Sequence, residues 1–399
     1  MRPFLRGQGV RVRIVIVGAG IAGLTLATAL SRYGIDPVVL EQAQRPALLG
    51  AGAQLPPNAT RPLIRLGLGD ALEDQGIRPA SRDTLHWRDG SLMESMPMGE
   101  EYEARFGAPY YTVLRSDLHA ALLSAVPAGS VRTGYYVTDV LDAADSITLR
   151  CADGREVHGD VVIGADGAHS AVRGALSPEA HQRSRLSVCR GLVPASAVPS
   201  LGGVPRIRVW LGPGRHFVCY PVSSGRALSF SAVLPNREVR LGSWNTPRRI
   251  DDLNRAFAGW SGEVSALVSA SKWIGVWALY ERAPVREWSQ GRIALVGDAA
   301  HPMMPFFSQG ITQSIEDAVV LAGLLHRATL QTVEESLTRY ARTRRERVER
   351  VQGLAVSLLG SLREAGESEV PGRPLLAERE RSEADWVYGH DVEADADVP

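Results

Sequence analysis

The sequence predicts an α/β fold: a Rossmann-like nucleotide-binding domain, an inserted antiparallel sheet and a long C-terminal helix. Three observations predict it. A β-branched run over 12–17 leads into a glycine-rich turn and a helix, and a charged helical pattern begins at Val333. Alternating stretches with aromatic residues occupy 205–212, 215–222, 227–234 and 272–280. At 399 residues the chain exceeds one core of usual size, so we expect two domains.

Charge and cysteine content limit the partners and the compartment. Lys+Arg and Asp+Glu both number 44, so no net charge favours nucleic acid or a membrane surface. The three cysteines are far apart and lack metal-ligand spacing, which favours a cytoplasmic protein without a metal centre. The basic, apolar start resembles a secretory signal, but glycines interrupt it, so residues 1–10 are interpreted as a loose extension. We expect no nucleic-acid partner and no stable membrane association.

The first strand runs directly into a glycine-rich turn that opens a helix, Gly18-Ala19-Gly20-Ile21-Ala22-Gly23. The first glycine permits a tight turn, the second lets the backbone approach a pyrophosphate, and the third lets helix and strand pack closely. Amides at the helix N-terminus then face the phosphates. Glu41 ends the next strand, where a carboxylate can bind both hydroxyls of an adenosine ribose. The pattern predicts FAD or NAD and does not choose between them.

A second motif, near residue 298, favours FAD. A buried strand ends in Asp298, a proline-rich turn follows, and Gly310 and Ile311 open a helix. The Asp298 carboxylate can hold the hydroxyls of a ribityl chain, which a nicotinamide dinucleotide lacks. Free amides beyond Gly310 can meet the N1 and C2 oxygen edge of an isoalloxazine, where reduced flavin carries negative charge.

Taken together, separated segments of the chain resemble the class A flavin-dependent aromatic hydroxylases, the group that includes salicylate hydroxylase and 4-hydroxybenzoate hydroxylase. The segments are Gly18–Gly23 with Glu41, Asp160–Arg173, and Gly297–Ala318. Residues 50–58 and 386–391 also resemble the salicylate-hydroxylase branch. The resemblance covers nearly the whole chain. It departs from the family at Ser308, Thr312 and Ser314, where the family commonly has Gly, Asn or Ala, and this leaves the substrate open.

The resemblance implies FAD as the cofactor and NADH or NADPH as a transient electron donor, because the chain has one dinucleotide fingerprint. It places Asp166 in a motif that serves FAD and the nicotinamide, Arg115 near the flavin, and the carbonyl of Pro305 near the site of oxygen activation. Each has a plainer alternative. Asp166 can begin a helix capped by Ser170, Arg115 can be an exposed helix-start residue, and Pro305 can simply form a turn.

The catalytic side chains are expected on the antiparallel sheet. Side chains alternate along a strand, so His216 and Tyr220 share one face of the strand over 215–222. His216 suits removal of a phenolic proton near neutral pH, and Tyr220 can orient the ligand or move a proton. A hydrogen-bonded structural histidine is the alternative. Met304, Phe306 and Phe307 are expected to wall the cavity, with ordinary core packing as the alternative. His301 is expected behind the cavity, and Glu316 and Asp317 are interpreted as helix-start charges.

We therefore expect an FAD-dependent monooxygenase that uses NAD(P)H and O2 to hydroxylate an electron-rich aromatic substrate, a phenolic acid or a hydroxylated N-heterocycle. The resemblance implies a C4a-hydroperoxyflavin, with or without decarboxylation. A flavin epoxidase or hydroxylase of an isoprenoid or polyketide, a flavin reductase without oxygenation, and a non-catalytic flavoprotein remain alternatives. A homodimer is left open.

The motifs also suggest a division of the chain. The expected FAD-binding domain comprises 10–82, 108–182 and 282–345, the substrate domain 83–107 and 183–281, and the C-terminal helix and acidic tail 346–399. Asn58 is expected to cap a short helix that ends at Gly67. The long helix is expected to carry mainly solvated charges, and the acidic tip to be mobile.

Overall fold

The computed structural model describes residues 12–44, 51–143, 146–177, 183–235, 250–272, 274–280, 285–304, 307–367, 382–383 and 385–395. The expectations for residues 1–10, for Pro305 and Phe306, and for the tip beyond 395 lie outside these residues.

A six-stranded sheet forms the core of the nucleotide-binding half. Its strands, in the order in which they lie, are β17 (Ser289–Gln290), β18 (Ile293–Leu295), β11 (Val161–Gly164), β1 (Ile14–Val17), β2 (Val38–Glu41) and β7 (Val131–Thr133). β1 lies parallel to β2 and β11, and all four of its residues are buried. Helices α1 (Ile21–Arg32) and α9 (Gln309–Leu325) pack against each other beside it. The motifs that follow β1, β11 and β18 therefore meet at the carboxyl ends of parallel strands.

Shorter elements surround this sheet. They are β3 (Gly52–Leu55), α2 (Pro57–Leu63), η1 (Ile64–Leu68), α3 (Gly69–Gln75), α4 (Glu100–Phe106), β6 (Tyr111–Leu114), α5 (Arg115–Ala125), β8 (Val137–Asp142), β9 (Ile147–Cys151), β10 (Glu156–Gly159), η2 (Gly167–His169) and α6 (Ala171–Leu176). The expected hairpin is confirmed as the antiparallel pair β9–β10. The expected cap is wrong: α2 begins at Pro57, and Asn58 is a buried residue inside it.

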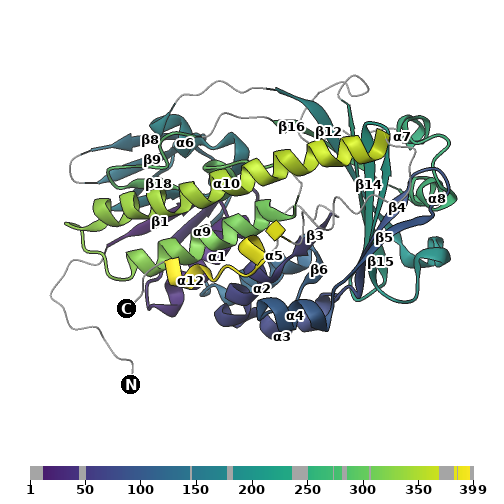
Figure 1. The fold of residues 1–399 in the computed structure, drawn as a ribbon. Coiled ribbons are helices and arrows are strands. Elements are labelled where there is room, and N and C mark those ends of the chain that lie inside the picture. The colour runs from purple at the N-terminus through teal and green to yellow at the C-terminus, as the bar shows by residue number, and fades with distance from the viewer. Residues whose placement is uncertain are drawn as a thin grey trace.

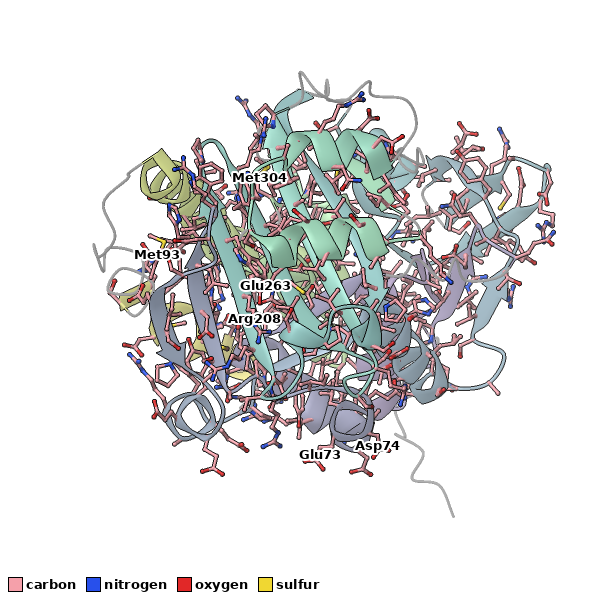
Figure 2. The ribbon with its side chains drawn as sticks, turned by 90° about the vertical axis from the view of Figure 1, so that its right-hand side faces the viewer. Glu73, Asp74, Met93, Arg208, Glu263 and Met304 are labelled. Carbon is pink, nitrogen blue, oxygen red and sulfur yellow. The ribbon has the colours of Figure 1, made fainter. Side chains whose placement is uncertain are left out.

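The second half is built on a seven-stranded sheet that contains the expected strands between 205 and 280. The sheet was expected to be antiparallel, but one pair of its strands is parallel, Ser81–His86 beside Arg206–Gly212. Its strands, in spatial order, are β16 (Ile274–Tyr280), β12 (Arg183–Pro194), β15 (Ala227–Pro235), β14 (Arg215–Val222), β13 (Arg206–Gly212), β4 (Ser81–His86) and β5 (Leu92–Pro97). The short helices η3 (Ala195–Ala197) and η4 (Pro199–Leu201) follow β12. Figure 2 shows α7 (Ile250–Ala256) and α8 (Gly262–Ala270) in front of the outer face of this sheet, where Arg208 and Glu263 lie. The opposite face of the sheet is left to meet the nucleotide-binding half.

The long helix α10 (Val333–Glu367) joins the two halves. It crosses the molecule in Figure 1, contacting β17 and β18 of one sheet and β13 and β14 of the other. It is continuous across residues 345 and 346, where a domain boundary was expected. The acidic tail also differs from expectation, because residues 385–395 are folded against the protein and end in α12 (Val392–Asp395). Within the described residues, no helix has the length and apolar character needed to cross a bilayer.

Candidate active site

A cavity of about 290 Å³ lies between the inner face of the seven-stranded sheet and the loops of the nucleotide-binding half. The sheet contributes Val188, Arg190, His216, Val218, Tyr220, Ser229, Phe230, Ser231 and Val233. The other half contributes Gly20, Ile21, Ala22, Gly52, Ala53, Gln54, Arg115, Ala165, Gly167, Asp298, Met303, Met304, Ser308, Gln309, Gly310, Ile311 and Ser314. The three separated motifs of the sequence therefore line one site.

The glycine-rich turn has the geometry that its spacing predicts. A Cβ on Gly18, whose φ is +107°, would lie 2.4 Å from the carbonyl oxygen of Ala165. A Cβ on Gly23 would lie 2.0 Å from the carbonyl oxygen of Gly18. Gly20 is different, because it lines the cavity and a Cβ there would meet no atom within 4 Å. The open space lies where a pyrophosphate needs to approach the backbone, so the turn fits a dinucleotide.

Two side chains clamp the peptide between these glycines. The amide of Ala19 donates to Glu41 Oε2 at 2.9 Å, and the amide of Ala43 donates to Oε1 at 2.8 Å. The carbonyl oxygen of Ala19 lies 2.8 Å from His119 Nε2, on α5. Glu41 ends β2 beside the turn and does not itself line the cavity. Sequence reasoning missed His119, which no local motif distinguishes from an ordinary helix residue.

The Asp166 side chain is bound to the start of α6, which is the plainer of the two readings. Its Oδ2 accepts from the amides of Ala171 at 2.8 Å and Val172 at 3.3 Å, while Ser170 accepts from the amide of Arg173 at 2.9 Å. Burial raises the pKa of Asp166, and its Oδ1 is buried without a hydrogen-bond partner in the described part of the chain. Asp166 therefore shapes the loop between two cavity-lining residues, Ala165 and Gly167.

Arg173 ties the second motif to the third. Its buried guanidinium donates to the carbonyl of Ala299 at 2.9 Å and to the carbonyl of Ala168. Asp298 lies in the turn η6 (Gly297–Ala299), with an exposed side chain at the cavity. Arg173 thus fixes the main chain around Asp298 from the neighbouring loop.

The other residues expected near a flavin also reach the cavity, with one exception. Arg115, Gly310, Ile311 and Met304 line it, and a Cβ on Gly310 would meet no atom within 4 Å. Phe307 is not among the lining residues; it is buried and stacks on Tyr388 with ring centroids 5.5 Å apart. It supports the site from behind, so the expectation that it walls the cavity is wrong.

On the inner face of the seven-stranded sheet, polar side chains lie at paired positions on neighbouring strands. His216 pairs with Val233, Tyr220 pairs with Ser229, and all of these residues line the cavity. One strand further on, Arg190 pairs with Ser231, which lies opposite Val218. Sequence reasoning missed Arg190. Its alternation with Val188 along β12 is the signal that could have placed it on this face.

The protonation of this face is set by burial. Burial, and then the charge of Arg82, lowers the pKa of His216 to about 4. Burial also raises the pKa of Tyr220. The imidazole is therefore neutral near pH 7 and can accept a hydrogen bond, while the tyrosine hydroxyl keeps its proton and can donate one.

Behind the cavity, Glu316 and Asp317 are fully buried in α9, so their interpretation as helix-start charges is wrong. Arg344 binds Glu316 at 2.8 Å and Asp317 at 2.9 Å, and Arg347 binds Glu316 at 2.7 Å. Burial alone would raise the pKa of Glu316, but the two guanidinium groups lower it to about 2. Buried charges persist only when paired in this way. The helix α10 therefore carries structural charges in addition to its solvated face.

This network reaches the cavity loops. Asp317 accepts from the amide of Gly297 at 2.9 Å and binds His301, and Glu316 accepts from Asn58 at 2.7 Å. Gln309 is joined to Asn58 at 3.2 Å, and it lines the cavity. His301 is thus buried behind the site, as expected. The paired charges hold the turn at Asp298 and the start of α9 in a fixed relation.

The fold and the cavity define a flavoprotein oxidoreductase, in which a dinucleotide turn and a small polar pocket face each other. A protein-family model for an FAD binding domain matches residues 11–355. A 3-amino-4-hydroxybenzoate 2-monooxygenase of Streptomyces platensis is 43% identical over 391 residues, covering 96% of this chain and 97% of the relative. A 6-hydroxynicotinate 3-monooxygenase of Pseudomonas fluorescens is 34% identical, with coverage of 86% and 90%.

Solved structures agree with this. A salicylate hydroxylase in a substrate complex superposes with a TM-score of 0.81 at 28% identity, with 97% of each chain covered. The chain belongs to the family of FAD-dependent aromatic monooxygenases. The expected fold class and cofactor are confirmed, and aromatic hydroxylation is favoured over the epoxidase, reductase and non-catalytic alternatives. Reduced nicotinamide is the usual electron donor in this family.

Proposed function

We propose that the enzyme hydroxylates a small aromatic ring that carries both a hydroxyl and a carboxylate. The observation that supports this most strongly is the inner sheet face, where Arg190 lies across from His216 and Tyr220. The same cavity also contains the residues proposed to hold the flavin, so the substrate is proposed to occupy the part of the cavity beside this sheet face.

Arg190 is the proposed carboxylate anchor. It lies on β12, separated from β14 by the single strand β15, and two strand spacings amount to about 10 Å. A ring can lie across that gap with its carboxylate at the guanidinium. Burial lowers the pKa of Arg190, yet a guanidinium keeps its charge and presents a planar fork that matches a carboxylate. The named substrates of both relatives described above also carry a hydroxyl and a carboxyl group on one ring.

His216 and Tyr220 are the proposed partners of the substrate hydroxyl. The neutral imidazole accepts the hydroxyl hydrogen, and the Tyr220 hydroxyl donates to the same oxygen. Withdrawing the proton toward His216 raises electron density at the ring carbons ortho and para to oxygen. Because the pKa of His216 is depressed to about 4, it assists by hydrogen bonding and not as a strong free base.

The cofactor wall is proposed to hold FAD through its main chain. The turn Gly18–Gly23, whose Gly20 and Ala22 line the cavity, would face the pyrophosphate, and Glu41, which holds the Ala19 amide, would face the adenosine ribose. Asp298 would bind the ribityl hydroxyls, and Gly310 and Ile311 the flavin edge, with Arg115 beside it. Bound FAD supplies the electron transfer from NAD(P)H and the activation of O2. The protein orients the ring and keeps water from the reacting carbon.

Some inferences from the sequence remain proposals of the same kind. Arg115, Asp166 and Pro305 keep their family roles as proposals, as does the division into two domains. A cytoplasmic location is proposed because Cys151 and Cys219 are buried thiols. A homodimer remains a prediction, which sedimentation of the purified protein tests.

The substrate proposal is tested by pairing aromatic acids with their amides. NAD(P)H oxidation and product formation are measured for 3-amino-4-hydroxybenzoate, 6-hydroxynicotinate and 3-hydroxybenzoate and for the matching carboxamides. The wild-type enzyme should prefer the acids. In the Arg190→Met variant the kcat/KM for the acid should fall about 10- to 100-fold, as expected for a charged hydrogen bond, while the amide changes little.

Arg208→Met is the matched control, because Arg208 lies on the outer face of the same sheet. It should keep the preference for the acids. Equal losses for acid and amide in the Arg190 variant would show that Arg190 does not read the carboxylate. An enzyme that turns over none of the acids, yet oxidises a neutral phenol with full coupling, would contradict the proposed substrate class.

A further inference from the structure

The C-terminal segment 385–395, called the C-terminal strap below, is not explained by cofactor or substrate binding. It contains the sequence Trp386-Val387-Tyr388, which resembles the salicylate-hydroxylase branch. Tyr388 is only 6% exposed.

Tyr388 belongs to an aromatic cluster at the edge of the site. Its ring stacks on Phe307, with centroids 5.5 Å apart and an interplanar angle of 22°. It also meets Phe106 edge-on at 5.7 Å and Tyr110 at 6.4 Å. The hydroxyl of Tyr110 donates to Gln54 Oε1 at 2.9 Å, and Gln54 lines the cavity. The cluster therefore touches a cavity residue through one side chain and the turn before α9 through another.

That turn is strained. Phe307 and Ser308 have φ values of 68° and 55°, in the left-handed region that residues other than glycine rarely adopt. Such conformations persist only when the surrounding structure holds them. Ser308, Gln309, Gly310 and Ile311 follow directly and line the cavity. The direction in which α9 presents its first amides thus depends on the turn that Phe307 anchors.

Arginines from two other helices bind the strap at several points along its length. Arg347 donates to the carbonyl of Val387 at 3.0 Å and to Glu316, so the strap joins the buried network of α9 and α10. Arg350 lies over the ring of Trp386 at 3.7 Å. At its far end, Arg65 binds Asp391 at 2.7 Å and Glu393 at 2.9 Å. These contacts come from helices α10 and η1, far apart in the sequence.

We propose that the C-terminal strap is a positioning element for the flavin site, in which Tyr388 holds the strained Phe307-Ser308 turn and thereby fixes the N-terminus of α9. Tyr388 lies outside the cavity lining and acts through Phe307. The inference concerns FAD binding and is independent of the proposed substrate.

The test compares three variants of the full chain by FAD affinity, measured from flavin fluorescence in a titration of apoprotein. Tyr388→Leu removes the stacked ring and should weaken FAD binding about tenfold, whereas Tyr388→Phe keeps the ring and should stay within about threefold. Phe257→Leu is the matched control, because Phe257 is equally buried on the outer side of the sheet. It should lower the unfolding temperature and leave FAD affinity unchanged.

A second measurement separates positioning from general stability. Hydrogen exchange at the amides of residues 307–311 should accelerate in Tyr388→Leu and not in Phe257→Leu. A Tyr388→Leu protein that unfolds at lower temperature but binds FAD normally, with unchanged exchange at 307–311, would overturn the proposal.

If Tyr388→Leu does not fold, the Arg65→Gln variant tests the proposal instead. Arg65 pairs with Asp391 at the exposed end of the strap, so this substitution loosens the strap without changing its buried residues. Its exchange should rise at 385–391 and at 307–311 together. An increase confined to 385–391 would contradict the proposal.

Discussion

The two walls of the cavity are built by different means. On the cofactor wall the main chain makes the site: Gly18 and Gly23 leave no room for a Cβ, while Gly20 and Gly310 leave open space. On the substrate wall the side chains make the site, with Arg190, His216 and Tyr220 spaced by strand register. A main-chain site tolerates almost no substitution, whereas side chains on a sheet can be exchanged without altering the backbone. This difference explains how one fold can keep its cofactor while its substrates vary.

The largest effect should come from the cofactor wall, where Gly20 and Gly23 lie three residues apart in the sequence but differ in the space around them. Gly23→Ala should prevent folding or leave apoprotein, because its Cβ would lie 2.0 Å from a backbone oxygen. Gly20→Ala should fold with nearly normal stability, because its Cβ meets nothing within 4 Å, and should bind FAD more weakly. Circular dichroism and FAD content measure the two outcomes. A Gly23→Ala protein that folds normally and is fully loaded with FAD would show that the close contact between Gly23 and the Gly18 carbonyl is not needed for the FAD site.

A smaller but still large effect is expected behind the walls, at the buried charges. Arg344→Met leaves Glu316 and Asp317 without their shared partner, and breaking a buried ion pair costs about 3–5 kcal/mol of unfolding free energy. Denaturant titration measures this cost. Arg345→Met is the control: Arg345 is exposed beside Arg344, and its loss should change stability by less than about 1 kcal/mol. Equal losses of unfolding free energy in the two variants would mean that the buried ion pairs do not stabilise the packing of α9 against α10.

The smallest effect concerns the substrate wall and depends on pH. The pKa of His216 is about 4 in the folded protein and about 6.5 in an unfolded chain, so the unfolded state binds more protons between these values. The stability that the neutral imidazole contributes is therefore complete above pH 6.5 and is lost as pH falls toward 4. Relative to His216→Gln, the wild type should lose up to about 3 kcal/mol across that window.

Paired denaturant titrations at pH 7 and pH 4.5 measure this loss. A stability difference between the two proteins that stays constant with pH would show that His216 is not held neutral by burial. Between pH 6 and 9, titration of His216 should contribute nothing to the rate profile, so any inflection there belongs to the substrate or to another group.

Some features of the fold and of the site could be predicted from the sequence, and others could not. The glycine spacing, Glu41 and the alternation of His216 with Tyr220 are local patterns, and the structure places them as their periodicity predicts. Arg190 was missed because the alternation along β12 can place it on this face but does not mark it as a binding residue. Glu316 and Asp317 were misread because their partners, Arg344 and Arg347, lie more than a helix away and their burial depends on how α9 and α10 pack. The docking of the acidic tail likewise depends on Arg65, which no pattern near residue 391 indicates.

The most direct test of the account is a crystal structure of the FAD-loaded enzyme with 3-amino-4-hydroxybenzoate. The account predicts the ring between the Asp298 loop and the inner sheet face, with its carboxylate paired to Arg190 and its hydroxyl between His216 and Tyr220. A ring bound in the reverse orientation, or lodged away from this sheet face, would contradict it.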